Sequence, residues 1–468
     1  MTNRDILNHG AIIALTSLLA SCASVDRAPE TLRPGVTQDY YSAHEKDYLT
    51  SLATLPENAF KSQDARYWWE NFQDPLLNRL VYESLNRSFD TKRALANVEQ
   101  AEAILRGVRA DLLPTVDLNG DSVLFDVSDA DVGTSLDLEW NVDLFGRTRT
   151  TVRQAQSNLA NSQANVQDIR RLILAQVSQA YTSYRTTEAR IALSQSNLKR
   201  LVENKSRITR LVDNGYSSKL DLNRAETQIS QLRSNIVDLE AQKTATRNAI
   251  ALIVQAVPQD LQSVLSDSST STPSLPTQIS PPRLDYIVRH RPDIRASEWA
   301  LVGATQSRQA AQLALYPDIT LGGDVLRLGS LGNLANFGNV SSSLFASIVQ
   351  PLLGRGRLLA NIDQENAQVK QALINYEETV FEAVLDIDTA LENWSRRQDQ
   401  VKFDKHSLDT AIEAQQLAER LFFAGETSFT AVIVAENTRL AAEETYLLTR
   451  QAAFESYISY SAATVPNW

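Results

Sequence analysis

The chain has 468 residues, a formal net charge of −11 and 43% hydrophobic residues, but only 16 glycines and 14 prolines. The negative charge argues against a phosphate-binding surface and hence against nucleic acid as a partner. No run of 18 or more apolar residues occurs, so a chain of this composition that crosses a membrane must do so as strands.

The N-terminus carries an apolar run, residues 11–19, that ends in small residues before Cys22, the single cysteine of the sequence. This run is too short to span a bilayer and predicts a signal peptide over residues 1–21. One cysteine can form neither an intramolecular disulfide nor a multi-cysteine metal site. Leu19–Cys22 resembles the bacterial lipobox, which implies that Cys22 is acylated and becomes the new N-terminus. The alternative is a buried cysteine behind an ordinary signal peptide. The residue after Cys22 is Ala23 rather than aspartate, which by analogy with bacterial lipoproteins implies delivery to the outer membrane.

The first element expected in the mature chain is a helix from Leu76 to Leu112, and a second such helix runs from Leu284 to Leu315. Pro114 and Pro317 follow them, and proline cannot continue a helix. Two strand-like runs come after each proline.

The run Leu136–Leu144 alternates strictly between apolar and polar residues, which predicts a strand with two different faces. Its polar face carries Asp137, Glu139 and Asp143. A soluble sheet with one wet face alternates in this way, and so does a strand between lipid and a water-filled lumen. In the second case these three acids form a lumenal acidic face.

After Gly146 the apolar period changes to threes and fours, which predicts a long helix from Arg147 to Asp213 without proline or glycine. At 1.5 Å per residue this helix is roughly 100 Å long. The turn at Gly215 leads to a return leg with heptad spacing, as in a coiled coil. The second half repeats the pattern from Arg355 to Ala424. We interpret the Leu/Ile stripes of these helices as packing residues.

The two halves match in the same order with slowly growing offsets, which indicates a duplicated unit. The matches are residues 90–120 with 293–323, 143–166 with 351–374, and the stretch around Gly215 with that around Gly425. The predicted divisions are a signal peptide 1–21, a lipidated N-terminal linker 22–66, a first repeat 67–254, a Ser/Thr/Pro-rich linker 255–283, a second repeat 284–461 and a C-terminal tail 462–468.

The duplication gives four strands per chain, which is too few for a membrane barrel. Membrane strands must close into a barrel, and such barrels start at about eight strands. At least two chains are therefore required, and three would supply about twelve strands.

Three motifs together carry a resemblance to a known family. They are Trp68–Leu77 (WWENFQDPLL), Arg291–Arg295 (RPDIR, preceded by His290 where the family has arginine) and Asp143–Arg147 (DLFGR). The chain resembles the TolC-like outer membrane factors, in particular the NodT-like efflux outer membrane lipoproteins, over nearly all of its mature length.

The resemblance implies a mainly α protein with membrane β-structure. Its fold would be a homotrimer whose 12-stranded β-barrel, with four strands per chain, is continuous with a long α-helical periplasmic barrel. The implied function is the exit duct of a tripartite efflux pump, with a periplasmic adaptor, an inner-membrane transporter and outer membrane lipid as partners. No cofactor is expected. Gly146 and Gly354 would allow the change from strand to helix.

The resemblance also implies roles for individual residues. The hairpin tips, with Gly215 and Gly425, would dock the adaptor. Arginines at the start of the long helices would reach lipid headgroups or simply lie on the surface: Arg147, Arg149, Arg355 and Arg357.

The periplasmic gate is where this chain departs from its relatives. Family members often have aspartates at the positions of Ala431 and Val434 and a tyrosine at that of Phe422, and Asp221 stands at the matching site of the first repeat. We therefore expect an apolar gate with Asp221 as the matching carboxylate. In the alternative, the alignment slips by a turn and Glu426 or Glu436 supplies the charge.

Other classes of function fit less well. The four histidines lie in unrelated contexts, so no enzyme is expected. A periplasmic coiled-coil lipoprotein would not explain the duplicated alternating strands. A type I protein-secretion duct remains the alternative within the family.

Overall fold

The computed structural model describes residues 65–464, except 127–128, 216–217, 268–272, 278, 280–283 and 331–339. The chain divides into two units, Met1–Pro56 and Glu57–Trp468, and all described residues belong to the second. The predicted signal peptide, Cys22 and nearly all of the predicted linker 22–66 lie outside the described residues.

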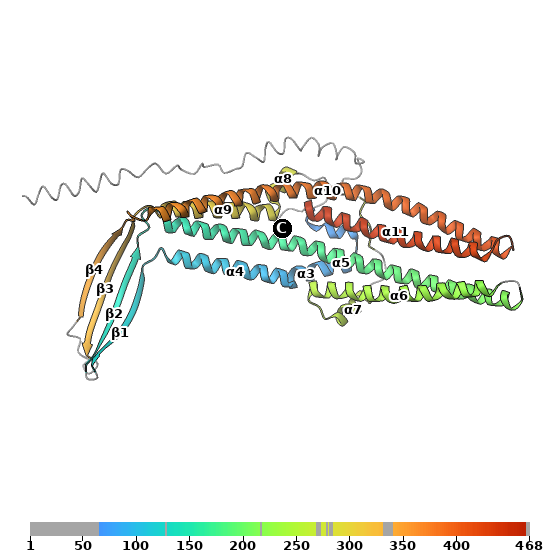
Figure 1. The fold of residues 1–468 in the computed structure, drawn as a ribbon, viewed down its shortest axis with the longest axis horizontal. Helices are drawn as coiled ribbons and strands as arrows, with labels where there is room; N and C mark the ends of the chain where they lie inside the picture. The colour runs from blue at the N-terminus through green and yellow to red at the C-terminus, as the bar shows by residue number, and fades with distance from the viewer. Residues whose placement is uncertain are drawn as a thin grey trace, which may run out of the picture. The chain divides into compact units, whose positions relative to one another are not determined.

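Both halves of the described chain have the same order of elements: helices, a β-hairpin and a long helical hairpin (Figure 1). The first half contains η2 (Ala65–Phe72), α3 (Pro75–Arg87), α4 (Phe89–Ala110), β1 (Thr115–Asp126), β2 (Asp129–Asn141), α5 (Arg147–Asp213) and α6 (Lys219–Val254). The second contains α7 (Pro258–Asp267), α8 (Leu284–His290), α9 (Pro292–Leu313), β3 (Asp318–Ser330), β4 (Val340–Val349), α10 (Arg355–Phe423) and α11 (Phe429–Thr464).

The single helices predicted before each hairpin are each broken into two. Leu76–Leu112 is interrupted at Ser88, which has extended backbone angles and whose hydroxyl accepts a hydrogen bond from the Asp90 N–H. A serine that caps a new helix in this way competes with continuation of the old one. Leu284–Leu315 is interrupted at Arg291, because Pro292 begins α9 and disfavours a helical residue before it.

The four strands form one antiparallel sheet in the order β1-β2-β3-β4, so the hairpins of the two halves join through β2 and β3. β2 ends at Asn141, three residues before the predicted end of the strand at Leu144. In Figure 1 the sheet lies at one end of the long helices α5 and α10, and the turns of the helical hairpins lie at the other.

Glycine allows the chain to pass from sheet to helix, as the sequence predicts. Gly146 and Gly354 are the N-terminal caps of α5 and α10 and have φ of 83° and 91°. L-residues with a side chain rarely adopt this left-handed conformation. The tip residues Gly215 and Gly425, with φ of 76° and 77°, have it too.

The long helical hairpins pack through the apolar stripes predicted from the sequence. Several stripe residues of α5 and α6 are fully or nearly fully buried, namely Ile173, Val177, Tyr184, Ile208, Ala225, Ile229, Leu232, Leu239 and Ile250. Within the described residues, no helix combines the length and apolar character needed to cross a membrane.

The stretch 255–283, predicted as a linker, contains the ten-residue helix α7. Pro258 suits the first turn of a helix, and Leu261 and Leu265 are buried. The Ser274 N–H then donates to the Phe72 carbonyl at 3.0 Å, so this segment packs against the N-terminal part of the first repeat.

Candidate functional site

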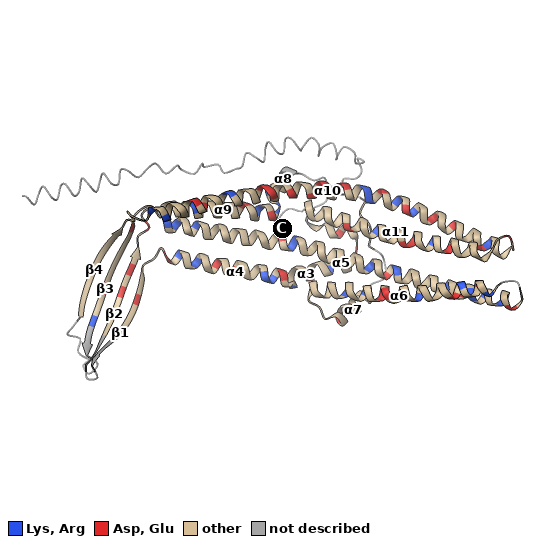
Figure 2. Cartoon of the chain, viewed as in Figure 1, with Lys and Arg blue, Asp and Glu red and all other residues tan. Residues whose placement is uncertain are grey.

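The sheet has an acidic face whose carboxylates stand side by side. Asp117 on β1 is opposite Asp137 on β2, and Asp137 is opposite Asp324 on β3. The Asp137 carboxylate accepts hydrogen bonds from Asn119 at 2.6 Å and Ser135 at 2.8 Å. Acidic positions on β1 and β2 are visible in Figure 2. Like charges directly opposite are destabilising, so this face requires water rather than lipid.

The other face of the sheet is apolar and exposed in the isolated chain. It carries Leu118, Leu136, Leu138, Trp140, Leu344 and Ile348, whose exposed fractions range from 38% to 88%. An apolar face of this size on a sheet of alternating strands is typical of contact with lipid.

Asp143, predicted on the acidic face of the strand, lies beyond the end of β2 and binds the first turn of α5 instead. The N–H groups of Thr148 and Arg149 donate to its carboxylate at 3.0 and 2.9 Å, and the Arg149 side chain pairs with it at 3.0 Å. The backbone turns at Gly146, so the alternation does not continue this far, and a carboxylate suits a helix N-terminus. Arg147 pairs with Asp318 of β3 at 3.2 Å.

The tips of the two helical hairpins pack against each other. Ile208 of α5, Ala225 of α6, and Phe429 and Val432 of α11 form one buried cluster. Arg224 of α6 donates to the Thr430 hydroxyl at 2.9 Å. The structure therefore holds the two tips of one chain together through an apolar centre and a polar rim.

The four predicted gate residues all lie near these tips, in different surroundings. Phe422 packs on the cluster, with its ring 5.5 Å from that of Phe429. Ala431 is half-buried, and Val434 is 59% exposed. Asp221 forms a capping box with Ser218 at the start of α6, so its carboxylate has a local structural partner.

Glu436, one of the alternative carboxylates for the gate, is buried above the tips with only 4% of its surface exposed. Its nearest charged partner is Arg200 of α5, at 3.5 Å. Burial raises the pKa of Glu436 above its ordinary value; Arg200 opposes the rise, Glu419 adds to it and Arg439 opposes it. Glu436 is thus an interhelical residue that does not present an exposed charge.

We expect Glu436→Gln to raise the thermal midpoint of the folded protein by a few degrees at pH 8. Because the pKa of Glu436 is higher in the folded than in the unfolded chain, the neutral carboxyl favours folding. The stability that it contributes is fully present below about pH 4.3, the ordinary pKa of glutamate, and is lost as the pH rises through the folded pKa. The gain should therefore shrink as the pH is lowered towards 5, which thermal unfolding monitored by circular dichroism can measure. Glu444→Gln, which removes the ion pair of α11 with Arg190 of α5, is the matched control. A gain that is equal at both pH values would contradict the assignment.

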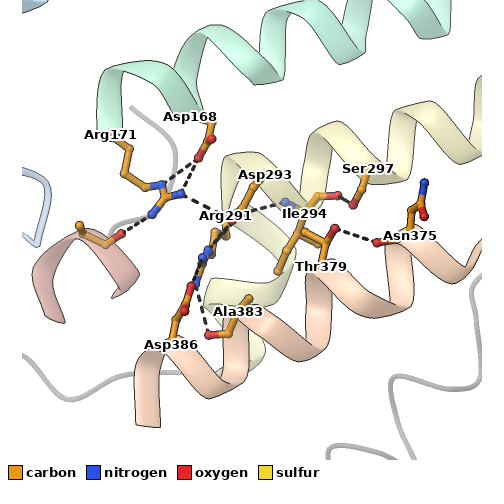
Figure 3. Close-up of polar contacts among 11 residues, drawn as sticks. Asp168, Arg171, Arg291, Asp293, Ile294, Ser297, Asn375, Thr379, Ala383 and Asp386 are labelled. Carbon is orange, nitrogen blue, oxygen red and sulfur yellow. Dashed lines mark hydrogen bonds and ion pairs between the residues drawn. The ribbon is translucent and has the colours of Figure 1, made fainter. Parts of the chain in front are cut away.

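The RPDIR motif forms a polar junction between helices around a buried arginine (Figure 3). Arg291, with 3% of its surface exposed, donates to Asp293 at 2.9 Å, to Asp386 of α10 at 2.8 Å and to the Ala383 carbonyl at 3.2 Å. Arg171 of α5 lies 3.6 Å from the same carboxylate of Asp293. It also pairs with Asp168 and donates to the Ala462 carbonyl of α11. The motif therefore fixes α9 against α10 and α5, and Arg171 connects the junction to α11.

The WWENFQDPLL segment is part of the core around the middle of α5. Trp69 and Phe72 are fully buried. Asp74 caps α3 by accepting from the N–H groups of Leu76 and Leu77, and it also accepts from the Tyr181 hydroxyl at 2.5 Å. Phe72 also packs on Phe454 and Tyr457 of α11, so both signature motifs are structural and join elements of the two repeats.

Sequence reasoning did not single out Arg171, Arg185 or Arg200, which complete these polar junctions. Arg185 donates to the Tyr181 hydroxyl at 3.0 Å and pairs with Glu188 at 2.8 Å. An arginine inside an amphipathic helix resembles a surface residue, so only the tertiary contacts reveal its role.

Comparison with known proteins supports the resemblance seen in the sequence. The family described as "Outer membrane efflux protein" matches residues 80–254 and 285–463. The probable outer membrane lipoprotein SilC of Salmonella typhimurium is 26% identical over 449 residues, which cover 93% of each chain. The cation efflux system protein CusC of Escherichia coli O157:H7 is 25% identical, over 94% of this chain and 95% of its own.

Solved structures show the same fold. The outer-membrane channel OprN has a TM-score of 0.79 and 24% identity, over 88% of this chain and 95% of its own. VceC of Vibrio cholerae has a TM-score of 0.76 and 21% identity, over 86% of this chain and 99% of its own. These similarities favour an efflux channel over an enzyme, a secretion duct or a coiled-coil spacer. Because the family description matches both halves of the chain, this protein belongs to the outer membrane efflux protein family.

Proposed function

We propose that three copies of this chain form the exit duct of a tripartite efflux pump. The observation that carries the proposal is the two-faced sheet, with Asp117, Asp137 and Asp324 in one row and an apolar face opposite. Four strands per chain close into a twelve-stranded barrel only if three chains contribute. The acidic row then lines the lumen, and the helices continue the passage through the periplasm.

Asp137 and Glu139 are the lumenal acids of this proposal. Asp137 lies within the row, and Glu139 is two residues farther along the same face of β2. Asp143 is replaced in this role by Asp117 and Asp324, because its carboxylate is held at the start of α5.

Conductance across a planar lipid bilayer tests the function directly. Purified protein is expected to insert with discrete current steps and to prefer cations, because the acidic row is the main lumenal charge. Asp137→Asn combined with Asp324→Asn should weaken the cation preference, whereas Asp111→Asn, at an exposed site outside the sheet, should leave it unchanged. Absence of current steps, or a preference for anions, would overturn the proposal.

The hairpin tips are the proposed docking ends for a periplasmic adaptor, and an inner-membrane transporter would feed the duct. Gly215 and Gly425 both turn with positive φ at these ends. Relatives are named for cation efflux and for toluene efflux, so kinship by itself does not assign an exported compound. The transporter upstream of the duct would make that selection.

The proposed gate is closed mainly by apolar packing around Phe422, with Ala431 and Val434 on the following helix. Asp221, half-buried at the start of α6, is its proposed carboxylate, since Glu436 is buried. Divalent cations added from the periplasmic side should therefore block the conductance only weakly, and Asp221→Ala should remove most of that block. A strong block that survives Asp221→Ala but is lost in Glu426→Ala would show that Glu426, at the turn of the hairpin, supplies the charge of the gate.

The proposed lipid anchor is Cys22, at the end of the predicted signal peptide. Cys22→Ser should abolish incorporation of labelled palmitate but leave trimer formation largely intact, because the strands themselves hold the protein in the membrane. Metabolic labelling followed by electrophoresis without heating measures both properties in one sample. Failure of the wild-type chain to incorporate palmitate would show that the lipobox interpretation is wrong.

A further inference from the structure

The duplicated unit places a pair of arginines at the start of each long helix. Arg147 and Arg149 begin α5, and Arg355 and Arg357 begin α10 at a shift of 208. Figure 2 shows basic residues where these helices meet the sheet. All four arginines are exposed, so the two pairs differ in their partners rather than in their access to the surroundings.

The arginines of the first repeat are neutralised within the chain. Arg147 pairs with Asp318 at 3.2 Å, and Arg149 pairs with Asp143 at 3.0 Å. The Asp143 carboxylate also accepts from the N–H groups of Thr148 and Arg149, which holds it at this junction. Each positive charge of the first pair therefore has a negative partner close by.

Both acids are missing at the corresponding positions around the second pair. Pro351 stands at the position of Asp143, and Thr115 at that of the aspartate on β3, since each of the latter two directly follows the proline after a helix. Within the part of the chain that the structure describes, no carboxylate pairs with Arg355 or Arg357. The start of α10 therefore carries two uncompensated positive charges within one helical turn.

Exposed apolar residues adjoin this second pair. The apolar face of the sheet ends on β4 at Ile348, and three more apolar residues follow before α10 begins. These are Val349, Leu352 and Leu353, with exposed fractions of 61%, 71% and 95%. The arginines thus stand at the edge of an apolar surface. In a bilayer that edge is the headgroup layer, where a long basic side chain can place its stem among apolar groups and its charge beside phosphate.

We infer that Arg355 and Arg357 bind the phosphate groups of anionic phospholipids on the periplasmic side of the outer membrane, and that the first arginine pair does not. Guanidinium groups bind phosphate through charge-assisted and frequently bidentate hydrogen bonds. The exposed leucines beside the pair contact the acyl chains, which favours a lipid over a free phosphate ion. The inference rests on the proposed duct, because only a chain that spans the membrane brings this junction to the headgroup layer.

Native mass spectrometry of the detergent-solubilised protein tests the pair. After incubation with equal amounts of phosphatidylglycerol and phosphatidylcholine that have the same acyl chains, the wild type should retain the anionic lipid preferentially. Arg355→Gln combined with Arg357→Gln should lower the ratio of retained phosphatidylglycerol to phosphatidylcholine by about tenfold or more, because each basic residue near an anionic lipid surface contributes about a factor of five. Arg147→Gln combined with Arg149→Gln removes the same charges from the neutralised pair and should leave the ratio nearly unchanged.

Two further variants separate charge from apolar contact. Arg355→Lys combined with Arg357→Lys keeps both charges and should retain most of the preference for phosphatidylglycerol, although lysine binds phosphate as a point charge without the planar fork. Leu352→Gln combined with Leu353→Gln keeps both arginines but removes the apolar neighbours, so it should reduce the amount of phosphatidylglycerol retained. A site that binds only free phosphate ions would not respond to the loss of the leucines.

Unheated electrophoresis and bilayer conductance of the same samples distinguish the lipid site from the function. The inference is overturned if wild-type trimers that conduct ions retain both lipids equally, or if the glutamine variants of the two arginine pairs lower the ratio to the same extent. In either case the proposed duct stands. A wild-type chain that forms neither trimers nor current steps would overturn both.

Discussion

Arg291→Leu is expected to destabilise the folded chain by about 1–3 kcal/mol, the cost of leaving polar groups without the buried donor that they shared. The substitution leaves Asp293 facing Arg171 alone and frees the Ala383 carbonyl and Asp386 of α10. Because α9 is held at its N-terminus by this junction, the helix should detach from α10 before the rest of the chain unfolds.

Heat-modifiable migration and thermal unfolding measure the effect of Arg291→Leu. The trimer band should be largely lost, and the thermal midpoint should fall by more than it does in Arg295→Leu, a change in the same motif at a half-buried position. Arg291→Lys should rescue only in part, because lysine cannot bridge two carboxylates and a carbonyl with a planar group. Equal stability of the leucine variant and the wild type would show that the junction is dispensable.

Gly425→Val is expected to reduce export by about tenfold or more while trimers still form. A β-branched residue in the left-handed conformation costs of order 1–3 kcal/mol, and 1.4 kcal/mol is a factor of ten in the population of the native turn. An added Cβ at Gly425 meets nothing within 4 Å, so the strain is confined to the backbone of the tip. The same reasoning applies to Gly215.

Asparagine tolerates the left-handed conformation, so Gly425→Asn should restore most of the export lost in the valine variant. Gly356→Val, on the exposed first turn of α10, has the same change in side chain without a positive φ and is the matched control. Export of a pump substrate and crosslinking to the adaptor report function, and unheated electrophoresis reports assembly. Normal crosslinking in both Gly215→Val and Gly425→Val would show that the tips are not part of the docking surface.

Much of this fold could be predicted from local sequence. Helix α5 begins and ends where expected. Gly146 directly precedes Arg147, Gly215 follows shortly after Asp213, and no helix-breaking residue lies between them. The strict alternation around Leu138 predicts a two-faced strand for the same local reason. The break at Ser88 was missed, since serine is compatible with a helix until its hydroxyl caps the next one.

The polar junctions could not be predicted, because their members are far apart in the sequence. Arg171 bonds to the Ala462 carbonyl and Arg200 pairs with Glu436, and no local pattern distinguishes them from surface residues. The same holds for Asp143. Its place in an alternating run predicts a strand, but the chain turns at Gly146 and the Asp143 carboxylate binds the first turn of α5.

The assignment of the two faces of the sheet is central to this account, and thiol labelling tests it most directly. Asp137→Cys and Leu138→Cys place the same group on adjacent residues of β2 that point to opposite faces. With the protein in outer membranes, a charged, membrane-impermeant thiol reagent should label the cysteine at 137 and spare the one at 138, while a lipid-soluble reagent should label the one at 138. Labelling of the cysteine at 138 alone, or of both equally, by the charged reagent would contradict a water-filled duct lined by the acidic face.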